Sequence, residues 1–235
     1  MAYSGGMVRY IASLFERGLV GPASRVLEFG AQKINECCET TDIERFLGAV
    51  GRRNEIINVD VKNFPGGLTG YLYQAAGLEY TSIDAFNGSF VHRLDINENP
   101  LPEKFRGYFE FITNVGTSEH IINQLGFFRA AHDAAAVGCS ILHQVPFSGY
   151  VNHGFFNYQP RFFEQIASAN KYDLVDFFVT GKHGPSTLRG REHNLGNAGL
   201  WDSEFLQNGL ITTVYRKRID RPFMPPLDIW EAPKP

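Results

Sequence analysis

Hydrophobic and polar positions follow two different periods along the chain. Between Met7 and Leu19 the apolar residues recur every three or four positions, which predicts an amphipathic helix ended by the Gly21-Pro22 pair. The next segment, 25–30, is a short β-type run broken by glycine, and a helix is expected over 42–50. Together these segments predict a first unit of strand, glycine turn and helix.

Strand and helix patterns then alternate over most of the remaining chain. After a strand-like piece at 56–61, strands are predicted over 80–84, 89–94, 108–115, 139–147, 174–180 and 210–216, and helices over 71–76, 118–136 and 160–170. The nearly continuous apolar run at 108–115 is typical of a strand buried on both faces of a parallel sheet. This order predicts a three-layer α/β sandwich with a mostly parallel, doubly wound, seven-stranded sheet and an antiparallel edge strand.

The domain organisation predicted from these patterns is simple. Residues 1–220 contain no linker or repeat and are expected to form one domain. The helix at 7–17 and the glycine-rich loop at 181–199 are expected to cover a binding site. Prolines in 221–235 favour an extended arm, which we expect to lie on its own body or on a second subunit of a homodimer.

Composition narrows the classes of partner. The chain of 235 residues has 22 Lys and Arg against 25 Asp and Glu, a net charge of −3 that argues against general nucleic-acid binding. An apolar run of about 20 residues, which a membrane helix needs, does not occur, and the first residues lack a secretory signal pattern. Three cysteines, two of them adjacent, favour a reduced setting. These features predict a cytoplasmic protein without a membrane partner.

The turn after the first strand has features of a ligand-binding loop. In Glu28-Phe29-Gly30-Ala31-Gln32 the glycine allows the backbone to approach a ligand closely, and the acid before it can accept a hydrogen bond from a cationic amino group. An ordinary strand-to-helix turn would look similar. The segment 31–35 lacks the further glycines of the Gly-x-Gly-x-x-Gly dinucleotide pattern.

Acids follow two later strands. Asp84 ends the strand at 80–84, where a carboxylate can accept hydrogen bonds from both vicinal hydroxyls of a ribose, and the same arrangement serves NAD. Asp60 is the rival ribose acid. Asp95 and Ile96 come after the strand at 89–94, where a turn acid is the alternative interpretation.

The buried strand at 108–115 opens onto a turn of small residues and then Ser118-Glu119-His120. Ser118 is a suitable N-cap for the helix predicted after it, and Glu119 could simply complement the helix dipole. After the strand at 139–147 comes a stretch at 148–158 in which His, Asn and Tyr alternate with aromatic residues. Such a mixture suits a pocket that orients a polar molecule between apolar walls, although an aromatic core cluster is also consistent with it.

Taken together, the motifs over 25–172 resemble those of a bacterial-type class I S-adenosylmethionine-dependent methyltransferase with a Rossmann-like fold. The resemblance implies S-adenosylmethionine as cofactor and S-adenosylhomocysteine as product. It implies adenine contacts by Asp95 and Ile96, and an acid followed by His, here Glu119-His120, beside the transferred methyl group. The cofactor contacts implied in this way are Glu28, Gly30, Ala31, Gln32, Asp84, Asp95, Ile96, Asn114 and Gly116.

The acceptor is expected to be a small or medium-sized polar molecule methylated at a hydroxyl or an amine. A hydroxyl needs a base, and we rank His153 first, His120 second and His143 third because imidazole titrates nearest neutral pH. A divalent metal could use histidines and Asp133, but sequence spacing does not show that they converge, so no metal centre is predicted. The residues considered for it are His120, His132, Asp133, His143 and His153.

Two other functions compete with this hypothesis. A nicotinamide-dependent oxidoreductase would share the strand, glycine turn and downstream acid, but lacks support from a Gly-x-Gly-x-x-Gly sequence. A methyltransferase-like subunit that binds a partner without catalysis is the second alternative. Binding of S-adenosylhomocysteine or of NAD would separate these functions.

Overall fold

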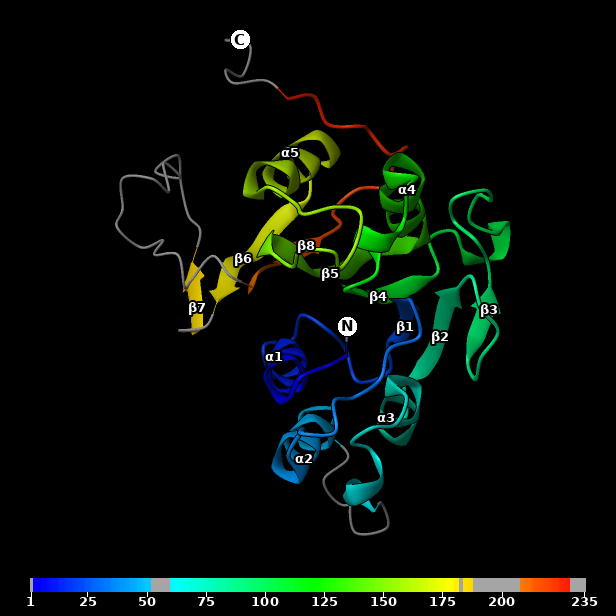
Figure 1. The fold of residues 1–235 in the computed structure, drawn as a ribbon. Coiled ribbons are helices and arrows are strands. Elements are labelled where there is room, and N and C mark those ends of the chain that lie inside the picture. The colour runs from blue at the N-terminus through cyan, green and yellow to red at the C-terminus, as the bar shows by residue number, and fades with distance from the viewer. Residues whose placement is uncertain (1, 52–59, 182–183, 188–207, 229–235) are drawn as a thin grey trace.

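A computed structural model describes residues 2–51, 60–181, 184–187 and 208–228, and their strands form one eight-stranded sheet (Figure 1). The sheet order is β3-β2-β1-β4-β5-β8-β6-β7. The strands are β1 (Arg25–Phe29), β2 (Glu79–Asp84), β3 (Val91–Arg93), β4 (Phe109–Val115), β5 (Ala135–Gly149), β6 (Asp173–Gly181), β7 (Gly184–Thr187) and β8 (Asn208–Arg216). The α-helices are α1 (Gly5–Glu16), α2 (Thr40–Ala49), α3 (Thr69–Ala75), α4 (Gln124–Ala134) and α5 (Pro160–Asn170), and the 3-10 turns are η2 (Val61–Asn63), η3 (Glu103–Phe105) and η4 (Ser118–His120).

The predicted mostly parallel sheet is confirmed, with one strand more than expected. Strands β3, β2, β1, β4 and β5 pair in parallel, whereas β8 is antiparallel to both β5 and β6. The strand predicted at 210–216 therefore lies inside the sheet, between β5 and β6, and does not form its edge. The antiparallel edge strand is β7, which falls within the segment predicted as a loop at 181–199.

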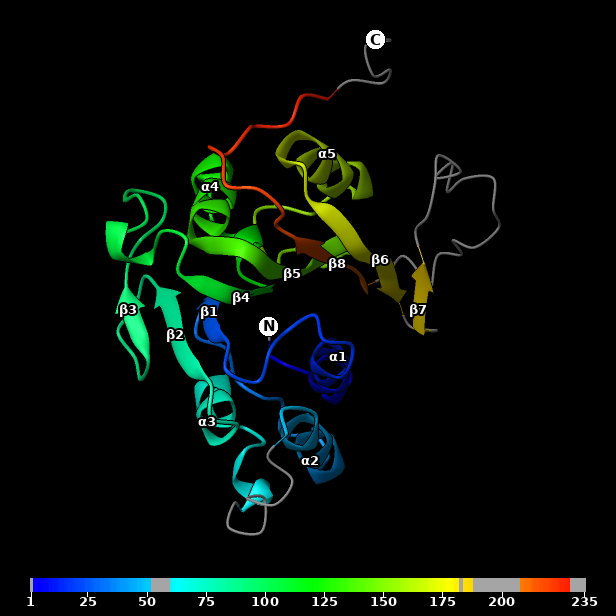
Figure 2. The ribbon, with the colours of Figure 1, turned by 180° about the vertical axis from the view of Figure 1, so that it is seen from behind.

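Helices cover both faces of the sheet, as a doubly wound fold requires. Helices α1, α2 and α3 lie on one face, and α4 and α5 lie on the other (Figures 1 and 2). Side chains alternate along each strand, so Val26 packs with the first group of helices and Leu27 with the second. In the central strand β4, Phe111 and Ile112 are divided between the two cores in the same way, which explains its nearly continuous apolar sequence.

The single helix predicted over 118–136 is wrong. The structure has the short turn η4 first, then a break at 121–123, and α4 begins only at Gln124. Asn123 caps this helix, since its Oδ1 accepts a hydrogen bond from the Gly126 N–H at 2.9 Å. The strand β5 begins at Ala135, directly after α4. In the strand-like piece predicted at 56–61, residues 56–59 lie outside the described residues, and Val61 belongs to η2.

The described part of the C-terminal arm lies on its own chain. Arg221 accepts a hydrogen bond from His132 Nε2 through its carbonyl oxygen, at 2.6 Å. Asn170, at the end of α5, pairs with both the N–H and the carbonyl of Met224, at 2.8 and 3.0 Å. The arm therefore packs across α4 and α5 (Figure 1). No helix in the described ranges is both long and apolar enough to cross a membrane.

Candidate active site

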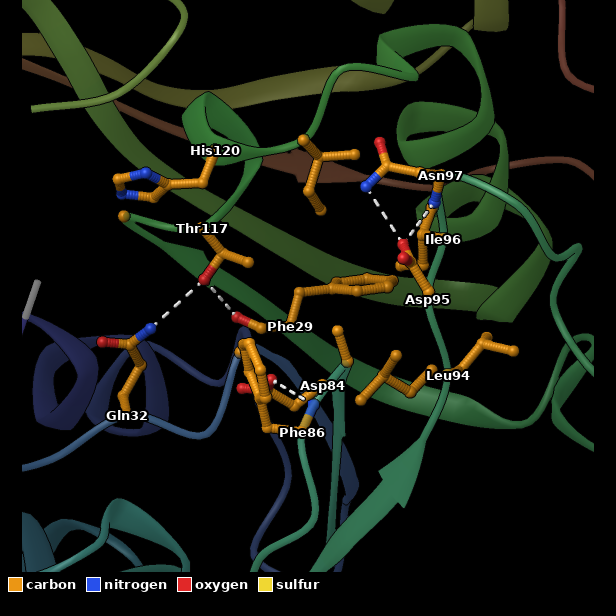
Figure 3. Close-up of a pocket in the computed structure, with 15 residues that line it drawn as sticks. Phe29, Gln32, Asp84, Phe86, Leu94, Asp95, Ile96, Asn97, Thr117 and His120 are labelled. Atoms are coloured by element: carbon orange, nitrogen blue, oxygen red, sulfur yellow. Dashed lines mark hydrogen bonds between the residues drawn. The ribbon is translucent and has the colours of Figure 1, made fainter.

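A cavity of about 430 Å³ lies at the edge of the sheet where β1, β2 and β4 end. These three strands are parallel neighbours, so their carboxyl ends meet at the same edge, where open α/β sheets bind ligands. Four short segments line the cavity: the turn after β1, the end of β2, residues 94–97 and the turn after β4 (Figure 3). The structure therefore brings together parts of all four predicted cofactor motifs.

The Gly30 turn needs a residue without a side chain. Gly30 has φ of +75°, and a Cβ atom there would lie 2.4 Å from Thr117 Oγ1. The Thr117 hydroxyl donates to the Phe29 carbonyl at 2.6 Å and accepts from Gln32 Nε2 at 3.2 Å, which ties the turns after β1 and β4 together. Gly30, Gln32 and Thr117 all line the cavity. Thr117 was not singled out from the sequence, where a threonine after a strand is a weak signal.

Glu28 does not line the cavity. Its side chain is fully buried, and one carboxylate oxygen accepts hydrogen bonds from the Gln32 N–H at 3.0 Å, from Thr69 Oγ1 at 2.6 Å and from the Tyr80 hydroxyl. Burial raises the pKa of Glu28, and these hydrogen bonds oppose the rise. The carboxylate thus fixes the turn after β1 from inside the protein, where the sequence had suggested contact with a ligand amino group.

Asp84 and the Asp95-Ile96 pair form facing parts of the cavity wall (Figure 3). Asp84 Oδ2 accepts from the Ala31 N–H at 3.1 Å, and its Oδ1 accepts from the Phe86 N–H at 3.0 Å. Asp95 Oδ1 accepts from the backbone and the side-chain amide of Asn97, at 2.9 and 3.0 Å. These backbone hydrogen bonds hold both carboxylates in fixed directions. Each bonded oxygen still has a second lone pair that can accept from a ligand.

The structure separates the two candidate ribose acids, Asp84 and Asp60, and adds the aromatic residue Phe86 to the cavity. The rival acid Asp60 caps η2, where it accepts from the Lys62 N–H, and it is not among the residues lining the cavity. Phe86 lines the cavity with 79% of its surface exposed. An aromatic side chain that is open to solvent can stack on a flat ligand. Sequence reasoning missed Phe86, since a single phenylalanine after a strand carries no pattern.

Asn114 and Gly116 differ in position although both follow from the same motif. Gly116 lines the cavity, but Asn114 is fully buried behind it. Asn114 Oδ1 accepts from the Ser118 N–H at 3.1 Å, and its Nδ2 donates to Ser118 Oγ at 2.9 Å and to His143 Nδ1 at 3.0 Å. Asn114 therefore shapes the turn that carries Glu119 and His120.

Glu119, His120 and His153 form one cluster at an end of the cavity. Glu119 Oε1 lies 3.8 Å from His120 Nε2 and 3.7 Å from His153 Nε2. The Glu119 side chain has no exposed surface, and burial raises its pKa to about 7. Burial and the neighbouring His153 lower the pKa of His120, which also lines the cavity. The three residues predicted to act on the acceptor are thus adjacent in space.

The remaining residues considered for a metal centre lie elsewhere. His132 is buried and bonded to Tyr172 and to the arm, and Asp133 pairs with Arg106 at 3.0 Å. His143 is buried behind Asn114, and burial lowers its pKa to about 3. His143 does not line the cavity, so its position does not support the third-ranked base.

Comparison with known proteins gives matches among solved structures alone, since no family model and no curated protein sequence matches. A 1,6-didemethyltoxoflavin-N1-methyltransferase of Burkholderia thailandensis, solved with S-adenosylhomocysteine, is 13% identical with a TM-score of 0.48, over 90% of this chain and 78% of that chain. A SAM dependent methyltransferase of Archaeoglobus fulgidus is 12% identical with a TM-score of 0.49, over 89% and 94%. Phosphoethanolamine N-methyltransferase 2 of Haemonchus contortus, solved with S-adenosyl-L-methionine, is 12% identical with a TM-score of 0.47, over 88% and 52%.

The fold class follows from the chain's own topology. A sheet that is parallel from β3 to β5, continues with the inserted antiparallel β8, and carries helices on both faces is a Rossmann-like, doubly wound α/β arrangement. At sequence identities this low, similarity of fold does not define the reaction, so the function has to be inferred from the residues of the site itself.

Proposed function

We propose that this protein is an S-adenosylmethionine-dependent methyltransferase that methylates a hydroxyl or an amine of a small or medium-sized polar molecule. The observation that carries the proposal is the cavity at the ends of β1, β2 and β4, which places Asp84, Asp95 and Ile96 around the glycine turn at Gly30, with His120 at one end. A nucleoside needs these groups in this order: a carboxylate for the ribose, an acid with an apolar neighbour for the base, and open backbone for the rest.

The residues present fit such a cofactor. Asp84 is anchored by the Ala31 and Phe86 N–H groups, so its free lone pairs can accept from two ribose hydroxyls. Ile96 is 5% exposed and offers an aliphatic surface beside Asp95, which can accept from an exocyclic amine. At Gly30 a Cβ atom would collide with Thr117, and the bare backbone leaves that part of the cavity open. S-adenosylmethionine supplies a methyl group made electrophilic by its sulfonium charge.

The transfer itself requires alignment and the removal of one proton. Bound S-adenosylmethionine, which Asp84, Asp95 and Ile96 would hold, would supply the methyl group to an acceptor oxygen or nitrogen and would leave as the neutral thioether S-adenosylhomocysteine. The acceptor proton leaves toward the Glu119, His120 and His153 cluster or to water. Holding the nucleophile about 3–3.5 Å from the methyl carbon lowers the barrier by removing the entropy cost of alignment, so we assign the cluster the task of orienting the acceptor.

The surroundings of His153 support an acceptor with an apolar part. Val151 and Phe155 flank His153 in the chain and are 86% and 65% exposed. Exposed apolar side chains next to His153 in the chain favour an acceptor that carries an apolar part beside the polar atom it presents to the cluster. The aromatic stretch at 148–158 thus divides into buried packing residues, such as Tyr158, and exposed residues beside the cluster.

Transfer of labelled methyl groups tests the activity. We expect the protein, incubated with methyl-labelled S-adenosylmethionine and a small-molecule cell extract, to label at least one compound detectable by mass spectrometry. His153→Gln should lower this labelling at least tenfold, because the acceptor loses a group that orients it or takes its proton. The control variant is His92→Gln, on β3, whose ring packs against Phe105 and does not line the cavity. Equal labelling by His153→Gln and the wild type would remove His153 from the mechanism.

A further inference from the structure

Glu119 has an unusual environment for a carboxylate. Its side chain has no exposed surface, yet neither of its oxygens has a hydrogen-bond partner among the described residues. A buried carboxylate in this state is costly unless a charge or a ligand compensates it. The Nε2 atoms of His120 and His153 lie 3.8 and 3.7 Å from Glu119 Oε1. A buried carboxylate without hydrogen bonds thus lies beside two imidazole nitrogens, which are common metal ligands.

We propose that Glu119, His120 and His153 bind one divalent transition-metal ion, such as Zn²⁺, at the end of the cavity. One ligand atom from each residue lies within 4.8 Å of the other two. Ligand atoms around a tetrahedral ion at about 2.1 Å are roughly 3.4 Å apart. The two distances from Glu119 Oε1, 3.8 and 3.7 Å, exceed this separation by a few tenths of an ångström, which a small side-chain rotation removes.

The donor set favours a transition metal over Mg²⁺ or Ca²⁺. Two imidazoles and one carboxylate suit Zn²⁺, Fe²⁺, Co²⁺ or Mn²⁺, whereas the other two ions prefer oxygen ligands throughout. Three protein ligands also leave at least one coordination position open, as in catalytic metal sites. His120 lines the cavity, so an ion held by this residue would lie beside the space proposed for the cofactor. An ion there would orient an acceptor hydroxyl and lower its pKa; this role rests on the proposed function, but the site itself does not.

The backbone holds the ligands in place before any ion binds. The Glu119 carbonyl accepts from the Phe155 N–H at 2.8 Å and from the Phe156 N–H at 3.3 Å, which fastens η4 to the turn after β5. Gly154 makes this approach possible, because a Cβ atom there would lie 2.9 Å from Glu119 Cγ. Tyr150 and Asn152 have φ of 51° and 60°, a left-handed backbone that occurs in the turn just before His153.

A network of polar side chains also holds η4 in place. Ser118 is bonded to Asn114, as described above, and the Tyr158 hydroxyl lies 2.9 Å from Ser118 Oγ and donates to Gln124 Oε1 at 2.7 Å. Gln124 Nε2 in turn donates to the Ser118 carbonyl at 2.7 Å. Supporting hydrogen bonds of this kind fix the orientation of ligands in metal sites. Positioning of Glu119 and His120 therefore does not depend on the ion.

Metal binding can be measured without cofactor or acceptor. Untagged full-length protein, stripped with a chelator and dialysed, is titrated with Co²⁺ and followed by its visible absorption, and Zn²⁺ is then added to displace it. We expect one equivalent of Co²⁺ to bind and Zn²⁺ to replace it. Glu119→Gln, His120→Gln and His153→Gln should each weaken binding at least 100-fold, while the control His92→Gln binds as the wild type does.

Thermal unfolding keeps the test valid if a variant folds poorly. Zn²⁺ should raise the Tm of the wild type and of His92→Gln, and should leave the Tm of Glu119→Gln unchanged. Wild-type protein that binds Co²⁺ no more tightly than His153→Gln would overturn the proposal, as would binding unaffected by all three substitutions. Binding of Co²⁺ without binding of S-adenosylhomocysteine would support the metal site and contradict the proposed methyltransferase function. Binding of S-adenosylhomocysteine without binding of Co²⁺ would contradict only the metal site.

Discussion

At the scale of single residues, a few atoms decide whether the cavity exists. Gly30 and Thr117 are 87 positions apart in the chain, yet the turn after β1 closes over the threonine hydroxyl without room for a methyl group. The acid motifs and Gly30 could be predicted from local sequence, because each depends on a strand end. The inward direction of Glu28 could not, since its partners Thr69 and Tyr80 come from other elements.

Gly30→Ala should impair both folding and ligand binding. The positive φ and the collision with Thr117 predict a loss of about 1–3 kcal/mol in the free energy of unfolding. Affinity for S-adenosylhomocysteine should fall at least tenfold, as measured by calorimetry. Gly138→Ala is the matched control, because Gly138 also has positive φ, +88°, but no atom within 4 Å of its added Cβ. Equal binding by the two variants would show that the Gly30 turn does not contact the cofactor.

His143 makes stability depend on pH. Burial lowers its pKa to about 3 in the folded protein, whereas the unfolded chain takes up the proton near pH 6.5. The stability contributed by neutral His143 is therefore complete above about pH 6.5 and is lost as the pH falls toward 3, by at most about 1.4 kcal/mol per pH unit. His143→Asn keeps an acceptor for Asn114 and removes the titrating ring.

Urea unfolding of both proteins between pH 7 and pH 5 measures this effect. The difference in unfolding free energy between the wild type and His143→Asn should shrink as the pH falls, since only the wild type loses the contribution of His143. Comparing the two proteins cancels the other buried groups, including Glu28 and Glu119. A difference that stays constant over this range would contradict the neutral, buried state of His143.

At the scale of elements, the site depends on two turns that pack against each other. The sequence predicted one helix from 118 to 136, because Ser118 resembles an N-cap and the apolar spacing continues through it. In the structure, contacts with Asn114 and Tyr158 occupy the Ser118 side chain, and Asn123 becomes the cap instead. Those competing contacts come from β4 and from the segment before α5, so local patterning could not reveal them.

Gly154→Ala should separate the two turns. The added Cβ would press against Glu119 Cγ at 2.9 Å and against the Glu119 carbonyl oxygen at 3.0 Å, so the turn after β5 has to move. We expect Co²⁺ affinity and methyl transfer to fall at least tenfold, with S-adenosylhomocysteine affinity within a factor of three of the wild type. Gly21→Ala serves as control, since its Cβ would make an ordinary contact with Ser24 Oγ at 3.6 Å. A variant that keeps wild-type Co²⁺ affinity would argue against a shared site.

At the scale of the whole molecule, the layered sandwich was predictable and the order of its last strands was not. Alternating strand and helix patterns fix a parallel sheet with helices on both faces, whatever the contacts of single residues. The insertion of β8 between β5 and β6 depends on pairing across the sheet, for example His143 with Thr213 and Phe177 with Thr213. Successive strands most often pair with each other, which is why 210–216 looked like an edge strand.

The arm should contribute to stability without touching the cavity. Asn170→Ala removes the side chain that pairs with both backbone groups of Met224, at a cost of about 1–3 kcal/mol. We expect a lower Tm and faster proteolysis at 221–228, with unchanged affinity for S-adenosylhomocysteine. Asn63→Ala, in the exposed turn η2, should stay within about 0.5 kcal/mol of the wild type. Weaker cofactor binding by Asn170→Ala would show that the arm couples to the site.

Calorimetric titration with S-adenosylhomocysteine tests the central claim most directly. The wild type should bind one equivalent, and Asp84→Asn should bind at least tenfold more weakly, because an amide presents one acceptor oxygen where the carboxylate presents two. Asp60→Asn, which alters the rival acid outside the cavity, should bind like the wild type. No heat of binding with S-adenosylhomocysteine, together with binding of NAD, would contradict the account, and so would equal affinities for Asp84→Asn and Asp60→Asn.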